Sequence, residues 1–136
     1  MRVAIVGSRS ITMDCFAEVL RYIPRGASEI VSGGAEGADA LAQQYAQYAH
    51  LPLKVFPPDY ARFRKSAPLQ RNIEIVRYSD YVLVLWDGRS RGAAHVIDNC
   101  IREYTPVHVL IIRNGALVQT LFGQTDGHLI PPSAKK

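Results

Sequence analysis

The stretch SGGAEGADALA, residues 32–42, places a strand end, a glycine-rich turn and a helix start directly one after another. Three of its first six residues are glycine, and an alanine-rich helical pattern follows at once. A Gly-Gly-x-x-Gly turn that leads into a helix lets phosphate oxygens approach main-chain N–H groups, because no Cβ stands in the way. The same turn also allows a helix to pack closely on a sheet, so the motif alone leaves both roles open.

Short apolar segments alternate with amphipathic ones along the rest of the chain. The predicted strands are Val3–Val6, Glu29–Val31, Leu53–Phe56, Tyr81–Trp86 and Val107–Ile112. The predicted helices are Asp14–Ile23, Ala38–Ala49, Pro68–Tyr78 and Gly92–Tyr104. This alternation indicates a parallel sheet that is covered by helices on both faces and connected by right-handed crossovers.

We therefore expect a three-layer α/β sandwich whose mostly parallel five-stranded sheet has the order 3-2-1-4-5. The pair Asn114-Gly115 is a hairpin signal, and it makes Leu117–Leu121 a candidate antiparallel strand on the sheet edge. A single domain over residues 1–122 accommodates this pattern, and residues 123–136 form a C-terminal tail.

The composition is that of a globular protein with one hydrophobic core, and it does not identify a ligand. Of the 136 residues, 48% are hydrophobic, which is enough for one core, and 16 basic against 12 acidic residues give a net charge of +4. That surplus suits an anionic partner of any size, from a phosphate to a nucleic acid. Cys15 and Cys100 have no CxxC spacing, the histidines have no metal-ligand spacing, and no apolar run is long enough to cross a membrane. We expect a cytoplasmic protein with no metal site and no membrane partner.

Ligands of such sheets bind at the carboxyl ends of the strands, where helix N-termini also point. Four segments are predicted to meet there: Gly7–Ser10, Gly33–Gly37, Pro57–Arg71 and Asp87–Gly92. They carry glycines, hydroxyl groups and arginines, which together predict an anion site suited to a nucleotide phosphate. Neither GxGxxG after the first strand nor GxxxxGK[ST] is present, so the usual dinucleotide site and P-loop ATP hydrolysis are not expected.

Four blocks in series resemble a known superfamily. They are GSRSIT (residues 7–12), SGGAEGADALA, QRN (residues 70–72) and SDYVLVLWDGRSRGAAH (residues 79–95). They resemble the SLOG superfamily of Rossmann-like domains, and within it the YspA-type proteins of the DUF2493 family. The resemblance implies a domain that binds a nucleotide or nucleotide-derived ligand, as its sensor or processor. It also implies a homo-oligomer, a dimer or larger, and it implies no cofactor.

Two better-understood branches of the superfamily suggest alternative functions. The Lonely-Guy phosphoribohydrolases cleave the N-glycosidic bond of nucleoside monophosphates, and Arg71 matches an arginine of theirs. Their catalytic glutamate falls on Val96 here, so no carboxylate remains there to stabilise an oxocarbenium-like ribosyl centre or to activate water. Other carboxylates stay open as substitutes without that placement: Glu36, Asp39, Glu74 and Asp87. If the protein is an enzyme, hydrolysis of that bond is the reaction the resemblance implies.

The second branch is DNA-processing protein A, which binds single-stranded DNA. The matching positions are Gly7, Arg9, Gly33, Gly37, Asp39, Arg71 and Asn72. Single-strand binding combines a basic groove with aromatic stacking platforms. Such residues flank the predicted edge: Tyr60, Phe63, Trp86, Arg62, Arg64 and Lys65.

The predicted ligand-binding residues are Gly7, Ser8, Arg9, Gly33, Gly34, Gly37, Asp39, Arg71, Asn72, Ser90, Arg91 and Gly92. Arg9 and Arg71 would supply charge, and the glycines and Ser90 would supply main-chain or hydroxyl contacts. Structural roles stay open for two of them, because Arg71 is placed to pair with Glu74 and Ser90 is placed to cap a helix. Nucleotide sensing, nucleotide hydrolysis and single-strand binding all remain open, and no catalytic residue is assigned.

Overall fold

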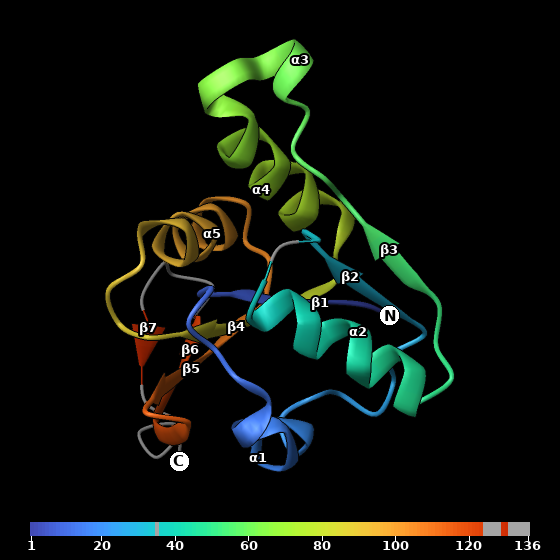
Figure 1. The fold of residues 1–136 in the computed structure, drawn as a ribbon, viewed down its shortest axis with the longest axis vertical. Helices are drawn as coiled ribbons and strands as arrows, with labels where there is room; N and C mark the ends of the chain where they lie inside the picture. The colour runs from blue at the N-terminus through green and yellow to red at the C-terminus, as the bar shows by residue number, and fades with distance from the viewer. Residues whose placement is uncertain (35, 124–128, 131–136) are drawn as a thin grey trace.

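The computed structural model describes residues 1–34, 36–123 and 129–130, which form a mixed sheet between two layers of helices (Figure 1). The strand order is β3-β2-β1-β4-β5-β6-β7. The strands are β1 (Arg2–Gly7), β2 (Glu29–Ser32), β3 (Leu53–Val55), β4 (Tyr81–Trp86), β5 (Val107–Arg113), β6 (Ala116–Gly123) and β7 (Leu129–Ile130). The α-helices are α1 (Phe16–Leu20), α2 (Ala38–Tyr48), α3 (Tyr60–Phe63), α4 (Ala67–Tyr78) and α5 (Arg91–Arg102). Short 3₁₀ turns cover Met13–Cys15 and Arg64–Ser66.

The predicted topology is confirmed. Strands β1 to β5 are parallel in the order 3-2-1-4-5, and β6 returns antiparallel beside β5. Strand β7, which pairs antiparallel with β6, was not anticipated. Residues 124–128 and 131–136 of the predicted tail lie outside the described residues, and the division of the chain at residue 122 stays a prediction.

Two helical segments differ from the sequence expectation. The helix predicted for Asp14–Ile23 is instead a 3₁₀ turn followed by the five-residue helix α1. After Leu20 the chain makes i to i+3 hydrogen bonds, such as Tyr22 N to Val19 O at 2.9 Å, because Pro24 disfavours helical geometry at the residue before it. The loop expected after β3 contains α3, whose first turn is capped by the Asp59 carboxylate, which accepts from Arg62 N at 3.1 Å.

The core has two halves because successive side chains of a strand point to opposite faces of the sheet. Val3 and Ile5 of β1 pack in one cluster with α1 and α2, while Ala4 and Val6 pack in the other with α4 and α5. The central strands β1, β4 and β5 are therefore almost continuously buried, as expected for a parallel sheet that is covered on both faces. Among the helices of the described residues, none is long and apolar enough to cross a membrane.

The end of β1 lies very close to β4. A Cβ at Gly7 would meet the main-chain carbonyl of Leu85, its partner in the parallel ladder. The next residue continues the contact, since Ser8 N donates to Leu85 O at 2.9 Å. This close approach fixes where the loop after β1 leaves the sheet, and so it fixes the position of Ser8 and Arg9.

One buried titratable group lies in the core layer beneath α1. His108 of β5 is 4% exposed, with its ring against Tyr22 (centroids 5.2 Å apart) and Phe122 (4.0 Å). Nδ1 is 3.4 Å from the hydroxyl of Tyr81, and Nε2 has no hydrogen-bond partner within the part of the chain that the structure describes. Burial lowers the pKa of His108 from 6.5 to about 4, so the ring is neutral near pH 7.

Candidate functional site

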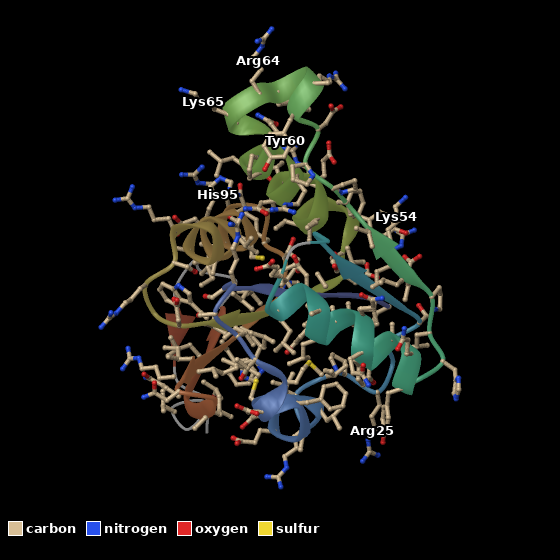
Figure 2. All side chains as sticks on the ribbon, in the orientation of Figure 1. Arg25, Lys54, Tyr60, Arg64, Lys65 and His95 are labelled. Atoms are coloured by element: carbon tan, nitrogen blue, oxygen red, sulfur yellow. The ribbon has the colours of Figure 1, made fainter. Side chains whose placement is uncertain are left out.

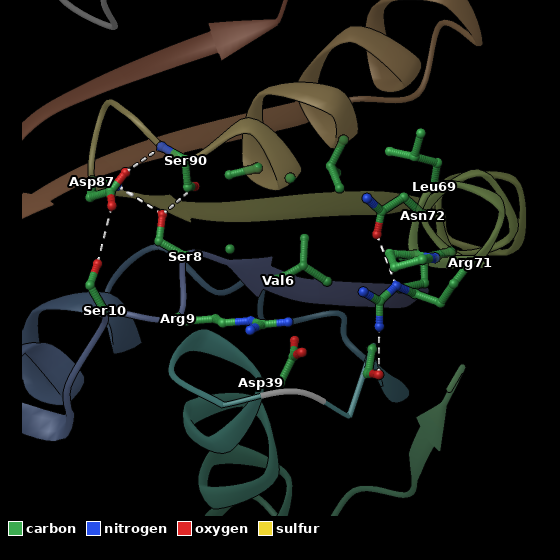
Figure 3. A pocket seen from close by; sticks show the side chains of 17 residues that line it. Val6, Ser8, Arg9, Ser10, Asp39, Leu69, Arg71, Asn72, Asp87 and Ser90 are labelled. Carbon is green, nitrogen blue, oxygen red and sulfur yellow. Dashed lines mark hydrogen bonds between the residues drawn. The ribbon is translucent and has the colours of Figure 1, made fainter. Parts of the chain in front are cut away.

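A cavity of about 470 Å³ opens at the carboxyl ends of β1 and β4 (Figure 3). The chain leaves β1 toward one side of the sheet and leaves β4 toward the other, which makes this the switch point where ligands of open α/β sheets bind. The predicted residues that line it are Gly7, Ser8, Arg9, Gly33, Asp39, Arg71, Asn72, Ser90 and Gly92. Segments far apart in the sequence therefore meet at one hollow.

Arg71 of α4 is held in place by two hydrogen bonds. Its Nη1 donates to the carbonyl oxygen of Gly33 at 2.7 Å, and its Nε donates to Oδ1 of Asn72 at 2.9 Å. Burial lowers the pKa of Arg71, whereas the nearby Asp39 acts in the opposite direction and Arg9 adds to the lowering. Figure 3 shows the Arg9 side chain extending along the cavity toward Arg71. Two arginines thus face the same space, with one carboxylate close by.

The first glycine of the turn at residues 32–37 makes room for this arginine. A Cβ at Gly33 would overlap Nη1 of Arg71, so any side chain at position 33 would displace the guanidinium. The group that approaches this backbone is therefore a side chain of the protein itself. In this way Gly33 contributes to the site by letting Arg71 reach it.

The other two glycines shape the turn. Gly34 and Gly37 have φ values of 76° and 74°, a conformation that side chains rarely adopt. The N–H of Gly34 donates to Oγ of Ser32 at 3.0 Å, and a Cβ at Gly37 would meet the carbonyl oxygens of Ser8 and Arg9. Neither glycine lines the cavity, and neither does the exposed Arg91. Direct ligand contacts of these three residues stay predictions.

Gly34→Ala is expected to lower the free energy of unfolding by about 1 to 2 kcal/mol, because alanine at this φ is strained. The neighbouring atom, Cγ1 of Val55, lies 2.8 Å from the Cβ position on a partly exposed strand and can shift, so backbone strain dominates. Urea denaturation measures the change. Gly26→Ala is the control, since nothing lies within 4 Å of its Cβ position. Equal stability of the two variants would contradict the assignment of strain to position 34.

A hydroxyl network ties the loop after β1 to the start of α5. The hydroxyls of Ser8 and Ser90 are 2.8 Å apart, and Asp87 N donates to Oγ of Ser8 at 3.1 Å. The Asp87 carboxylate accepts from the N–H groups of Arg89 and Ser90, both at 2.8 Å, and from the hydroxyl of Ser10 at 3.2 Å. Burial by itself would raise the pKa of Asp87, but these hydrogen bonds outweigh it and lower the pKa.

Because Ser90 bonds to Ser8, its hydroxyl does not cap α5, whose first turn has no side-chain cap. The first turn of a helix carries unsatisfied N–H groups and partial positive charge. Gly92 lies in that turn and lines the cavity, and the space where its Cβ would stand is open. The structure therefore combines a helix N-terminus with two arginines around one hollow.

Behind Arg71 the polar chain continues to a histidine. Asn72, 6% exposed, places Nδ2 at 3.4 Å from Nδ1 of His95, and Nδ2 of Asn99 lies 3.3 Å from Nδ1 and 3.2 Å from Nε2 of the same ring. Burial lowers the pKa of His95, Asp98 opposes this and Arg102 adds to it. A neutral imidazole thus supports Asn72, which in turn orients Arg71.

The sequence did not reveal the apolar wall of the cavity. Leu69 and Ile75 of α4 and Val96 of α5 line it together with smaller apolar groups. Their helical spacing is that of core residues, so nothing in the pattern marks them as ligand-facing. Val96, the position on which the phosphoribohydrolase glutamate falls, is one of these apolar residues. Within residues 1–34, 36–123 and 129–130, no group of three or more His, Cys, Asp or Glu could hold a metal ion.

The fold and this cavity define a Rossmann-like α/β protein with an arginine-bearing hollow at the switch point of its sheet. A sequence model of the YspA, cpYpsA-related SLOG family matches residues 1–63, and the Gene 61 protein of Mycobacterium phage D29 is 33% identical over 125 residues, covering 84% of this chain and 96% of that protein. The chain belongs to the YspA, cpYpsA-related SLOG family.

A solved structure shows the same fold. It is DNA processing protein A from Helicobacter pylori, described for its single-stranded DNA binding mode, with a TM-score of 0.65 and 23% sequence identity. The match covers 84% of this chain and 66% of that one, so the present chain spans about two thirds of the length of that structure.

Proposed function

We propose that the cavity binds a nucleotide or a nucleotide-derived small molecule through its phosphate, and that the protein acts as a sensor or processor of that ligand. The observation that carries the proposal is the arrangement of Arg71. Its guanidinium is fixed by Gly33 and Asn72, lies beside Arg9, and shares the hollow with the first turn of α5. A guanidinium held in this way provides charge-assisted donors for phosphate oxygens.

Two arginines, Arg9 and Arg71, and two aspartates, Asp39 and Asp87, line the cavity, so the case for an anion depends on how the carboxylates are engaged. Asp87 lines it, but its carboxylate already accepts hydrogen bonds from two main-chain N–H groups and the Ser10 hydroxyl. Asp39 lies on the α2 side, below the Arg9 side chain in Figure 3, and can accept a hydrogen bond from a ribose hydroxyl. Leu69, which is 45% exposed, offers an apolar surface for a base, whereas Ile75 and Val96 are buried. A volume of about 470 Å³ lies in the range of small-molecule sites.

The proposal is tested by titrating the protein with the four common nucleoside monophosphates and ADP-ribose, using calorimetry and thermal shift. Arg9→Gln is expected to lower the affinity for the nucleotide that binds about tenfold, because one charged hydrogen-bond donor is lost. Arg25→Gln is the control, since Figure 2 places Arg25 at the end of the molecule opposite α3. The matching nucleoside without phosphate should bind weakly. Absence of binding across the whole panel would refute the proposed function.

Single-strand binding is a second candidate, and one surface favours it. The segment Tyr60–Ser66, here called the arm, comprises α3 and the following 3₁₀ turn, and Arg64 and Lys65 project outward from it (Figure 2). Tyr60 in the arm is 57% exposed. Exposed aromatic rings beside cations are typical of single-strand binding surfaces, and the DNA processing protein A neighbour is described for that activity. Binding of this kind would fall steeply with added salt. Self-association stays a prediction of the sequence.

A further inference from the structure

A second cavity of about 490 Å³ adjoins the first one. It lies between the turn after β1, the Asp87–Arg89 turn and the β5–β6 hairpin, and it shares Ser10 and Asp87 with the first cavity. We propose that the two cavities form one bipartite site for a ligand of two nucleotide units joined by a phosphodiester, with the second phosphate at Arg113 and Arg89. This inference rests on the proposed function and specifies its ligand class.

The partition between the cavities consists of two side chains. Oγ of Ser10 donates to Oδ2 of Asp87 at 3.2 Å, and the rest of the Asp87 carboxylate is held by the N–H groups of its own turn. Both cavities are partly open to solvent, and this pair lines each of them. A ligand that enters at Arg9 therefore needs to pass only the Ser10–Asp87 pair to reach the second cavity, a step that a single internucleotide linkage can make.

The second cavity repeats the chemistry of the first. Each has two arginines, one carboxylate of its own beside the shared Asp87, and buried branched apolar residues. The corresponding groups of the second cavity are Arg89, Arg113, Asp14, Ile11 and Ile112. The Asp14 carboxylate accepts from the Thr12 hydroxyl at 3.3 Å and offers a further acceptor, as Asp39 does in the first cavity. Two hollows of matching composition fit two units of the same kind.

Arg113, like Arg71, lies close to a glycine. Gly88 has φ 84°, and a Cβ there would stand 3.0 Å from Nη2 of Arg113. The guanidinium therefore lies against the turn that follows β4, and Arg113 lines the second cavity. A mononucleotide would leave this arginine without a phosphate, since one such unit fills only one hollow of about 470 to 490 Å³.

The test compares mononucleotides with 5′-phosphorylated dinucleotides by calorimetry on the full chain at fixed salt. The probes are AMP against pApA and UMP against pUpU, with a 12-nucleotide single strand of each base as a third arm. The better-bound dinucleotide is expected to bind at least about tenfold more tightly than its mononucleotide. Arg113→Gln is expected to remove most of that gain, with a change of less than about twofold for the mononucleotide.

Two further variants guard against indirect effects. Arg89→Gln should act in the same direction as Arg113→Gln, and Arg102→Gln, an exposed arginine at the end of α5, should change neither affinity. If no mononucleotide binds, the proposed function itself fails. If a mononucleotide binds but the dinucleotide gains nothing, or if Arg113→Gln weakens both equally, the bipartite site is overturned. If the 12-nucleotide strand binds more tightly than the dinucleotide, the ligand is a longer single strand. If the two bind with equal affinity, the ligand is a free dinucleotide.

Discussion

Replacement of Arg71 by alanine is expected to lower nucleotide affinity about a hundredfold, the largest effect of any single change at the cavity. The guanidinium is partly buried and already oriented by Gly33 and Asn72, so it loses little freedom when it binds a phosphate. Hydrogen bonds to charged groups contribute about 1.5 to 3 kcal/mol, and a hundredfold change corresponds to about 2.7 kcal/mol. Calorimetry with the nucleotide that the panel selects measures the loss.

A matched control lies on the same helix. Arg77 is exposed on α4 and pairs with Glu103 at 3.0 Å, so Arg77→Ala should change affinity by less than about twofold. Arg71→Lys should recover only part of the affinity, because an ammonium cannot reproduce the two fixed contacts of the guanidinium fork. An Arg71→Ala protein that melts normally and binds within threefold of the unmodified chain would contradict this role.

Acidification is expected to destabilise the protein through His108. The pKa of this histidine is about 4 in the folded protein and 6.5 when it is exposed, so above pH 6.5 both states are neutral and its full contribution is present. As the pH falls from 6.5 to 4, the unfolded state binds a proton that the folded state does not, and stability declines. The difference corresponds to a loss of about 3 kcal/mol. Urea denaturation at pH 7 and at pH 4 measures it.

The control for this prediction is His108→Leu, which fills the site with an apolar group that does not titrate. The loss between pH 7 and pH 4 should shrink by at least half. Part of this pH-dependent loss of stability should remain in His108→Leu, because burial also lowers the pKa of His95. The lowered pKa of Asp87 reduces stability as the pH falls from the ordinary aspartate range toward more acidic values, so most of its contribution is still present at pH 4. An unchanged pH dependence in His108→Leu would show that another group is responsible.

The strand order could be predicted because the apolar segments were short, uninterrupted and separated by helical patterns. Tyr81–Trp86, for example, is a six-residue apolar run, and the structure has β4 with the same bounds. The predicted helix Asp14–Ile23 had both bounds wrong, because local turn geometry and not hydrophobic periodicity determines where α1 begins and ends. The turns at Tyr60–Ser66 were missed because a single capped turn leaves no periodic signal.

The location of the cavity followed from topology, whereas its detailed contacts did not. The carboxyl edge of the sheet brings Ser8, Arg71 and Ser90 to one cavity, as their positions after predicted strands or in an early helical turn indicated. The sequence could not show that Gly33 faces a side chain, because that contact joins residues 38 positions apart. The second cavity was likewise hidden, since it depends on the hairpin after β5 folding back toward the first loop.

The close approach of Arg71 to Gly33 has an evolutionary consequence. The two positions are sterically exclusive: a side chain at 33 and an arginine reaching across from 71 cannot coexist in this geometry. Positions 33 and 71 should therefore vary together among relatives, so that arginine at 71 occurs with glycine at 33. Both residues should be absent from relatives that do not bind the proposed ligand. The first of the pair lies inside the segment matched by the family model and the second lies beyond residue 63. The co-occurrence of this pair would distinguish family members that keep the proposed anion site from those that keep only the fold.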